Sequence, residues 1–235
     1  MVDLAASLVA ALPRSADCEA ATGGWLSQPA NAVSSLAYVV AGLWVLHWAR
    51  RRGDVDLRLA VGYGLAVFLT GLGSADYHGT HSPASSFLHD WGLSSTLLFI
   101  VVFDLSLLLG WERAKQWAAF LAAVATAGVV LMVAPTMGAA LTGAGALAMV
   151  VAEGGLLITG RRSWWRPGGS PEAAAYSMAA TALLVSVVVY LASRTDGVLC
   201  DPDSLLQGHA AWHVLTALAL GGWARASLPG AGPRH

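Results

Sequence analysis

Two short stretches of this chain carry histidines at helical spacing at the edges of apolar runs. In the first, Ser74 and His78 are four residues apart near the end of one apolar run, and Asp90 opens the next. In the second, His209 and His213 are again four residues apart. Residues at this spacing lie one turn apart on one face of a helix. Two such faces could meet around a metal ion that takes three nitrogen ligands and keeps one position open.

Three neutral imidazoles and a water molecule are the ligands of a catalytic zinc ion. Zinc lowers the pKa of its water to about 7 and polarises a carbonyl oxygen. Hydrolysis also needs a carboxylate that accepts a proton and returns it to the leaving group, and Asp90 is placed for this. The Ser74 hydroxyl could hold the water or donate to a developing oxyanion. We therefore expect His78, His209 and His213 as zinc ligands, and Asp90 and Ser74 as catalytic residues.

The composition places these residues in a membrane protein. Of the 235 residues, 56% are hydrophobic and only 11% are charged, and the mean hydropathy is +0.61. This is too apolar for an ordinary soluble domain. The formal net charge of -1 provides no general attraction to nucleic acid. We expect an integral membrane protein whose partners are the bilayer and its lipids, with no nucleic acid.

The apolar residues fall into seven segments, each close to the roughly 20 residues that a bilayer crossing takes. Their approximate bounds are Asn31 to Ala49, Leu57 to His78, Leu88 to Gly110, Ala114 to Ala134, Met137 to Gly160, Glu172 to Ser193 and Leu205 to Arg225. The run from Ala114 to Gly160 is about twice the length of one crossing, so Pro135 is interpreted as a turn that divides it. The expected fold is all-α, a polytopic bundle of seven transmembrane helices.

The basic residues predict the orientation of this bundle. Eleven of the thirteen Lys and Arg residues follow odd-numbered segments or lie in the C-terminal tail, against only Arg14 and Arg194 on the other side. The positive-inside rule then puts the N-terminus outside and the C-terminus in the cytoplasm. Richness in Ala, Gly and Arg fits a GC-rich bacterial source, so we expect an inner-membrane protein. In this topology His78, Asp90 and His209 all lie towards the periplasm.

The same topology organises the rest of the chain. We expect an N-terminal extramembrane segment over residues 1–30, a transmembrane hydrolase domain over 31–225 and a cytoplasmic tail over 226–235. The first apolar run lacks basic residues before it and is followed by Pro13, so we interpret it as an interfacial helix or loose tail, not as a cleaved signal peptide. Cys18 and Cys200 both lie on the outer side, where they could form a disulfide. Asp104 and Glu153 are expected to bind polar groups of other helices.

The site residues carry a resemblance to a known family. The chain resembles the alkaline ceramidases in three motifs. These are Ser-x-x-x-His at the end of the second segment, Asp at the start of the third and Gly-His-Ala-x-Trp-His in the seventh. The alkaline ceramidases belong to a wider group of seven-helix hydrolases with the progestin and adipoQ receptors and the haemolysin III proteins. The resemblance extends to 17–19, to Asn31 with Ser34 and Ser35, and to 207–213.

This resemblance implies a zinc-dependent amidase that cleaves the N-acyl bond of a ceramide and releases a fatty acid and a sphingoid base. It implies His78, His209 and His213 as zinc ligands, Asp90 as the acid and base, and Ser74 as a polar partner of water or substrate. It also implies a calcium ion beside the first helix, for which Asp17 and Glu19 are the acidic residues here. Another lipid amide or an ester would suit the same chemistry.

Two other functions remain open for the same residues. A receptor-like or signalling protein of the same group would hold zinc as a structural ion without turnover, and Asp90 or His89 could then close the fourth position. A transporter could use the polar cluster for ions, but the broken-helix pairs that such proteins use are not evident. The residues favour the hydrolase.

Overall fold

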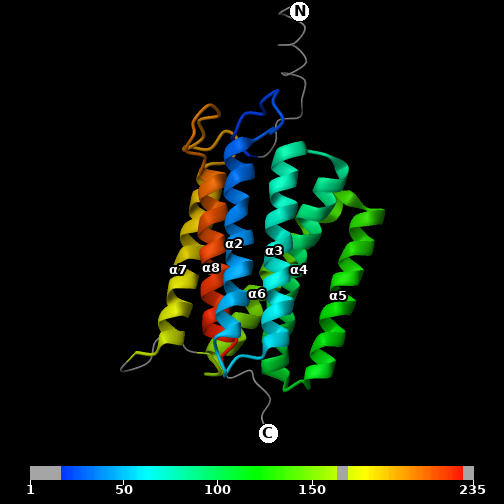
Figure 1. Cartoon of the computed structure of the whole chain (residues 1–235), viewed down its shortest axis with the longest axis vertical. Coiled ribbons are helices and arrows are strands. Elements are labelled where there is room, and N and C mark those ends of the chain that lie inside the picture. The colour runs from blue at the N-terminus through cyan, green and yellow to red at the C-terminus, as the bar shows by residue number, and fades with distance from the viewer. Residues whose placement is uncertain (1–16, 163–168, 230–235) are drawn as a thin grey trace, which may run out of the picture.

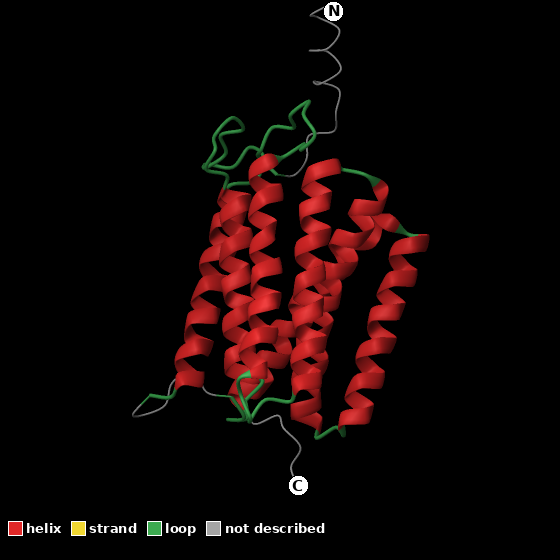
Figure 2. Cartoon of the chain, in the orientation of Figure 1, coloured by secondary structure: helices red, strands yellow, loops and turns green. Residues whose placement is uncertain are grey.

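The structure is a computed structural model that describes residues 17–162 and 169–229. Within these ranges the chain consists of long α-helices joined by turns and loops, and it forms no strand (Figures 1 and 2). The expected all-α class is therefore confirmed. The first apolar run, interpreted above as an interfacial helix or loose tail, lies outside the described residues, as does the end of the C-terminal tail.

Seven long helices make up the described bundle. They are α2 Pro29–Arg50, α3 Leu57–Thr80, α4 Pro83–Leu109, α5 Arg113–Val133, α6 Gly138–Ile158, α7 Pro171–Ala192 and α8 Gly208–Ser227. Six of them, α2 to α7, are long and apolar enough to cross a membrane by length and composition. The chain is thus a helical integral membrane protein. α8 is of similar length but is not among the six, since it carries several polar side chains.

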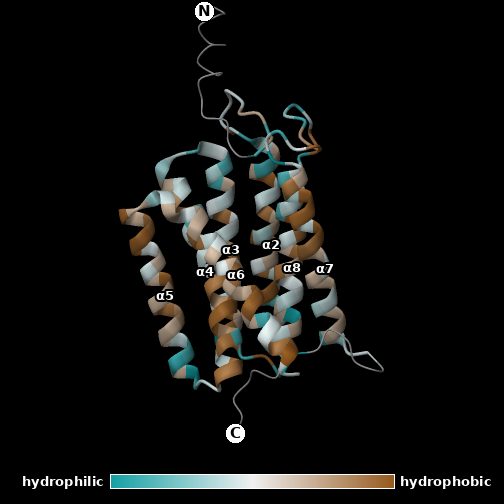
Figure 3. Cartoon of the chain, turned by 180° about the vertical axis from the view of Figure 1, so that it is seen from behind, coloured by the Kyte–Doolittle hydropathy of each residue, from teal (hydrophilic) through white to brown (hydrophobic). Residues whose placement is uncertain are grey.

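The helices form two groups that meet along α2 and α3 (Figure 1). α2 packs against α3 and α8, and α8 packs against α7. On the other side α3 packs against α4, which also contacts α5 and α6. Hydrophobic residues run along the helices, whereas hydrophilic ones gather mostly at the two ends of the bundle (Figure 3). Apolar side chains such as Met132, Met178 and Leu184 are largely exposed on the outer faces of the bundle, as expected where lipid is the solvent.

Two helix boundaries differ from the expected ones in a way that affects the site. α4 begins at Pro83 and not near Leu88, because Ser82 and Pro83 start the helix instead of breaking the chain. The Ser82 hydroxyl accepts from the Ser85 N–H at 3.1 Å, and Pro83 occupies the first turn. Asp90 consequently lies inside the helix and does not open it. Similarly, α8 begins at Gly208 and not at Leu205, so that His209 is its second residue.

A short 3-10 turn, Pro135–Met137, separates α5 from α6. Proline has no N–H to continue a helix and its ring clashes with the preceding turn. The long apolar run from Ala114 to Gly160 is therefore two helices, as predicted from its length. The turn also places the start of α6 beside the site end of α4.

A polar cluster lies in the bundle towards the end of α8. It confirms the prediction for Glu153, whereas Asp104 pairs with a residue that follows α6 and lies in no helix. Arg162 forms an ion pair with Glu153 and a second one with Asp104 at 3.1 Å. The Tyr176 hydroxyl and the Trp223 indole N–H also donate to Glu153, at 2.9 and 2.7 Å. The cluster thus joins α4, α6, α7 and α8 and is separate from the histidine site.

Candidate metal centre

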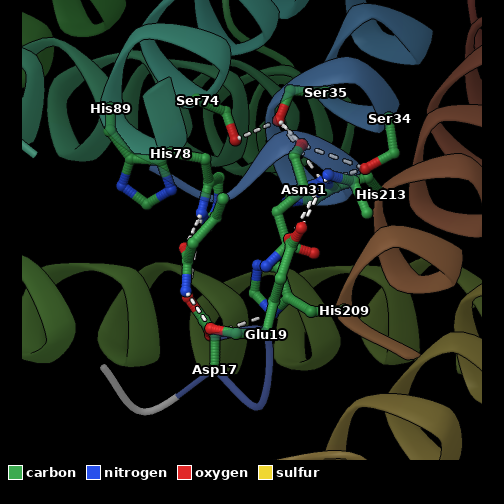
Figure 4. A network of polar contacts seen from close by, with 12 residues as sticks. Asp17, Glu19, Asn31, Ser34, Ser35, Ser74, His78, His89, His209 and His213 are labelled. Atoms are coloured by element: carbon green, nitrogen blue, oxygen red, sulfur yellow. Dashed lines mark hydrogen bonds and ion pairs between the residues drawn. The ribbon is translucent and has the colours of Figure 1, made fainter. Parts of the chain in front are cut away.

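The structure brings the three predicted histidines together at one end of the bundle (Figure 4). His78 lies in the last turn of α3, whereas His209 and His213 lie in the first two turns of α8. Their nearest candidate ligand atoms all lie within 4.8 Å of one another. His78 and His213 are fully buried and His209 is nearly so. These three residues could hold a metal ion.

The hydrogen bonds of Gln28 fix the tautomer of His78. The Gln28 amide nitrogen donates to the backbone oxygen of Glu19 at 3.0 Å, so its carbonyl oxygen Oε1 faces the other way. That oxygen lies 2.7 Å from Nδ1 of His78. Because a carbonyl oxygen only accepts, Nδ1 must carry the proton and Nε2 must carry the lone pair. Nε2 is buried and has no hydrogen-bond partner among the described residues.

Two serines of α2 give His213 the same tautomer as His78. Ser34 and Ser35 both donate to the backbone oxygen of Asn31, at 3.0 and 2.7 Å. Each hydroxyl has only one hydrogen to donate, so towards His213 the two oxygens act as acceptors. Nδ1 of His213 lies 2.9 Å from the Ser34 oxygen and 3.3 Å from the Ser35 oxygen. Nδ1 therefore carries the proton, and Nε2 is left with the lone pair.

Asp17 lies beside Nδ1 of His209, the same ring nitrogen that is contacted in His78 and His213. Its carboxylate oxygen Oδ1 lies 3.1 Å from Nδ1 of His209, close enough for an ion pair but not aligned as a hydrogen bond. The second oxygen, Oδ2, lies 3.9 Å from Nδ1 of His78. A carboxylate beside Nδ1 favours the tautomer that has its proton there. Hydrogen bonds to Nδ1 thus leave Nε2 of His78 and His213 for a metal ion, and the charge of Asp17 favours the same tautomer at His209.

This donor set fits a zinc ion. Metal-binding histidines almost always donate from their second ring nitrogen to a carboxylate, a carbonyl or another polar partner. His78 and His213 do so here, and His209 has the Asp17 carboxylate beside that nitrogen. The imidazole Nε2 atom of His78 is buried and finds no hydrogen-bond partner in the part of the chain that the structure describes. Such an atom needs an explanation such as an ion. Zn–N bonds of about 2.0–2.1 Å would draw the rings closer together than in this structure. Three imidazoles favour zinc, although other transition metals also bind imidazole.

Ser74 belongs to a polar layer beside the histidines. Its hydroxyl is buried and lies 2.9 Å from the hydroxyl of Ser35. Since Ser35 uses its hydrogen towards Asn31, Ser74 is the donor in this contact. The side-chain amide of Asn31 is also buried, and neither its nitrogen nor its oxygen has a hydrogen-bond partner in the described chain. Ser74 is therefore linked to His213 through Ser35, and Asn31 offers two further unused polar atoms nearby.

His89 contacts Asp90 and also lies near the histidine site. Oδ1 of Asp90 accepts from Nδ1 of His89 at 2.9 Å. The ring of His89 lies 6.3 Å from the ring of His78, measured between centroids. The Asp90 carboxylate also lies against Gly138, the first residue of α6, where unpaired helix N–H groups favour a negative charge. Asp90 therefore contacts His89, whose ring lies beside one of the predicted metal ligands.

A glycine of α3 allows this approach. A Cβ atom on Gly73 would lie 2.6 Å from the backbone oxygen of Leu88 and 2.8 Å from the backbone nitrogen of His89. No side chain fits in that space without moving a helix. The absence of a side chain at Gly73 thus lets α4 pass close to α3, and this places His89 near His78.

The two acidic residues that the resemblance assigns to calcium have other contacts in this structure. Both carboxylate oxygens of Glu19 accept from the first N–H groups of α2, those of Ala30 and Asn31, at 2.7 and 2.8 Å. Glu19 thereby caps α2 from outside the helix. Asp17 faces His209 and His78. Calcium binding at this place remains a prediction.

Cys18 and Cys200 form a disulfide, as the topology predicts. Their Cα atoms are 5.4 Å apart across a sequence separation of 182 residues. The bond ties the segment before α2 to the loop between α7 and α8, and both lie at the end of the bundle where α8 begins (Figure 1). It therefore covers the end of the bundle at which the candidate site lies.

Sequence reasoning missed Gln28 and undervalued His89. Gln28 precedes α2 and is 50 residues away from His78, so no spacing pattern links them. His89 was considered only as an alternative fourth ligand. The signal that could have pointed to it is its place beside Asp90 in the first turns of α4.

Comparison with models of known protein families and with curated proteins gives no match for this chain.

Proposed function

We propose that this protein is a zinc-dependent intramembrane hydrolase that cleaves the N-acyl bond of ceramide or a related lipid amide. The observation that carries the proposal is the meeting of His78, His209 and His213, whose candidate ligand atoms lie within 4.8 Å of one another. Hydrogen bonds to Nδ1 leave Nε2 of His78 and His213 available as ligands. The resemblance to alkaline ceramidases in the same residues supports the choice of reaction.

For the membrane, we propose seven crossings, with α8 as the seventh. α8 has 20 residues, enough for about 30 Å, and lies between α2 and α7. Polar residues on this helix are tolerated because neighbouring helices cover them. The clustering of Arg and Lys at the other end supports an outside N-terminus. In a bacterial inner membrane the site would then lie towards the periplasm.

The residues of this chain would have separate roles in binding the metal and in orienting its ligands. His78, His209 and His213 would hold the zinc ion, and Gln28, Ser34 and Asp17 would keep the rings in the required tautomer. When bound, zinc supplies a Lewis acid for the amide carbonyl and a means of ionising water near neutral pH. A zinc ion with only three protein ligands keeps a position for this chemistry.

Proton transfer would fall to Asp90 and His89. Asp90 accepts the Nδ1 proton of His89 and so leaves the lone pair of this ring on Nε2. Nε2 of His89 could then take up a proton and pass it to the leaving amine. The side-chain amide of Asn31, which has no hydrogen-bond partner in the described chain, could donate to the carbonyl oxygen as it gains charge. The Ser74 hydroxyl could do the same by turning its hydrogen away from Ser35.

An apolar groove supports a lipid substrate. It has a volume of about 730 Å³, lies between α2, α7 and α8 and is lined mainly by Ala, Val, Leu and Gly. Its lining includes Ala37, one turn after Ser34, and Val214, which follows His213. The groove thus begins beside the candidate site. A hydrocarbon chain could lie there while the polar group reaches the histidines.

The experiment starts from the metal content of the purified protein and of the His209→Ala, His213→Ala double variant. The intact protein is then incubated with a mixed lipid extract, and released fatty acid is measured. About one zinc ion per chain, lost in the variant, together with fatty acid release, is the expected result. Zinc without release would favour a receptor-like protein with a structural ion, for which His89 is near enough to be a fourth ligand. Absence of zinc from the wild type would overturn the proposal.

A further inference from the structure

One carboxylate faces two of the three candidate zinc ligands. The oxygens of Asp17 lie 3.1 Å from Nδ1 of His209 and 3.9 Å from Nδ1 of His78. Asp17 itself is largely buried, with 11% of its side chain exposed. A carboxylate in this position fixes the ring orientation and makes the opposite nitrogen a stronger ligand. Asp17 is therefore placed to strengthen the site without binding the metal itself.

The position of Asp17 depends on contacts that reach across the bundle end. Asp17 precedes α2 and belongs to no helix; its backbone pairs with Arg194 in an isolated bridge. The next residue, Cys18, is bonded to Cys200 in the loop before α8. Beyond it, the N–H of Ala20 donates to the backbone oxygen of Pro202 at 3.1 Å. Of these tethers to the loop, only the disulfide is covalent.

We propose that Asp17 is a positioning residue for His209 and that the Cys18–Cys200 disulfide holds it in place, so that breaking the disulfide weakens zinc binding. This inference rests on the proposed zinc site. When a phosphine reduces the disulfide, the S–S bond takes two electrons and two protons to become two thiols, and the phosphine becomes its oxide with oxygen from water. The tether is then lost, and the segment before α2 gains conformational freedom.

Zinc affinity, measured by competition with a chelator in detergent, tests this on the full chain. Asp17→Ala should weaken binding by about 10- to 100-fold, the usual effect of removing an outer partner of a ligand. Asp17→Asn should weaken it less, since the amide oxygen still places partial negative charge beside Nδ1. The Cys18→Ser, Cys200→Ser double variant should also weaken binding, and it leaves no thiol that could bind zinc. Asp201→Asn, an exposed carboxylate next to Cys200, is the matched control and should bind as the wild type does.

Combining the changes shows whether the disulfide acts through Asp17. If it does, Asp17→Ala should add little to the loss already caused by the two serine substitutions. Fully additive losses would overturn the inference, as would wild-type affinity in either Asp17→Ala or the double serine variant. Should the double serine variant fail to fold, Asp17→Ala with the disulfide intact still decides the role of Asp17. A wild type that binds no zinc would overturn the proposed zinc site itself. A zinc affinity that does not change when Asp17 is replaced would overturn only this inference.

Discussion

The side-chain carbonyl of Gln28 lies 2.7 Å from Nδ1 of His78, while the amide nitrogen of the same side chain donates to the backbone oxygen of Glu19. These two contacts determine which way the amide points. They join the chain before α2 to the last turn of α3. The buried residue that immediately precedes α2 thus decides which nitrogen of His78 has a lone pair for a metal.

Replacing Gln28 with Ala should therefore weaken zinc binding without removing a ligand. The expected loss is about 10- to 100-fold in affinity, because the ring of His78 can then adopt the wrong tautomer or rotate. Competition with a chelator measures it. Gln116→Ala is a suitable control, since Gln116 is also buried but contacts Arg113 far from the site. An unchanged affinity in Gln28→Ala would mean that this contact does not orient His78.

Asp90→Asn should leave zinc bound and abolish most of the hydrolysis. The asparagine cannot hold His89 as a carboxylate does, and loss of a general acid or base usually lowers the rate by about 10²- to 10⁴-fold. The measurement pairs zinc content with fatty acid release from the lipid that the wild type cleaves. Turnover at the wild-type rate would remove Asp90 from the mechanism.

The His89→Gln variant tests whether Asp90 transfers the proton directly or through His89. If the proton passes through His89, this variant should lose about as much activity as Asp90→Asn, and the double variant should lose little more. Zinc content should again stay at the wild-type level. An active His89→Gln beside an inactive Asp90→Asn would show that the carboxylate acts by itself. Loss of zinc in His89→Gln would instead identify His89 as a fourth ligand.

Arg162→Ala should destabilise the protein strongly while leaving zinc affinity intact. The change leaves the carboxylates of Asp104 and Glu153 without their buried cation, and breaking a buried ion pair in this way costs about 3–5 kcal/mol. The midpoint of thermal unfolding in detergent should therefore fall. Arg52→Ala breaks an exposed ion pair with Asp54 and should change the midpoint little. A normal midpoint for Arg162→Ala would show that the cluster does not hold the helices together.

Much of this architecture could be predicted from the sequence because hydropathy and spacing act locally. The apolar segments match the helices, and the four-residue spacing of His209 and His213 puts them on one face of α8. The disulfide follows from the alternation of the segments. The predicted start of α4 near Leu88 is wrong, because a Ser-Pro pair can mark either a chain break or the start of a helix.

The remaining features depend on how distant parts of the chain meet. Whether His89 or Asp90 faces His78 depends on how α4 is rotated and how closely it approaches α3, which no periodicity specifies. The contact of Gln28 with His78 depends on the path of the chain before α2, where no regular element imposes a spacing. The role of Asp17 depends on that path in the same way. Such contacts can be recognised only once the fold is known.

Gly138→Ala tests whether the placement of the Asp90 carboxylate matters. A Cβ atom at this position would lie 1.8 Å from Oδ2 of Asp90, so the carboxylate must move away from the start of α6. Its hydrogen bond to His89 should then be disturbed, and turnover should fall while the zinc ligands, which lie on α3 and α8, keep their metal. Gly143→Ala is the matched control because a Cβ there meets nothing within 4 Å in the same helix. Equal activity in both variants, with zinc bound, would show that the position of Asp90 is not critical for hydrolysis.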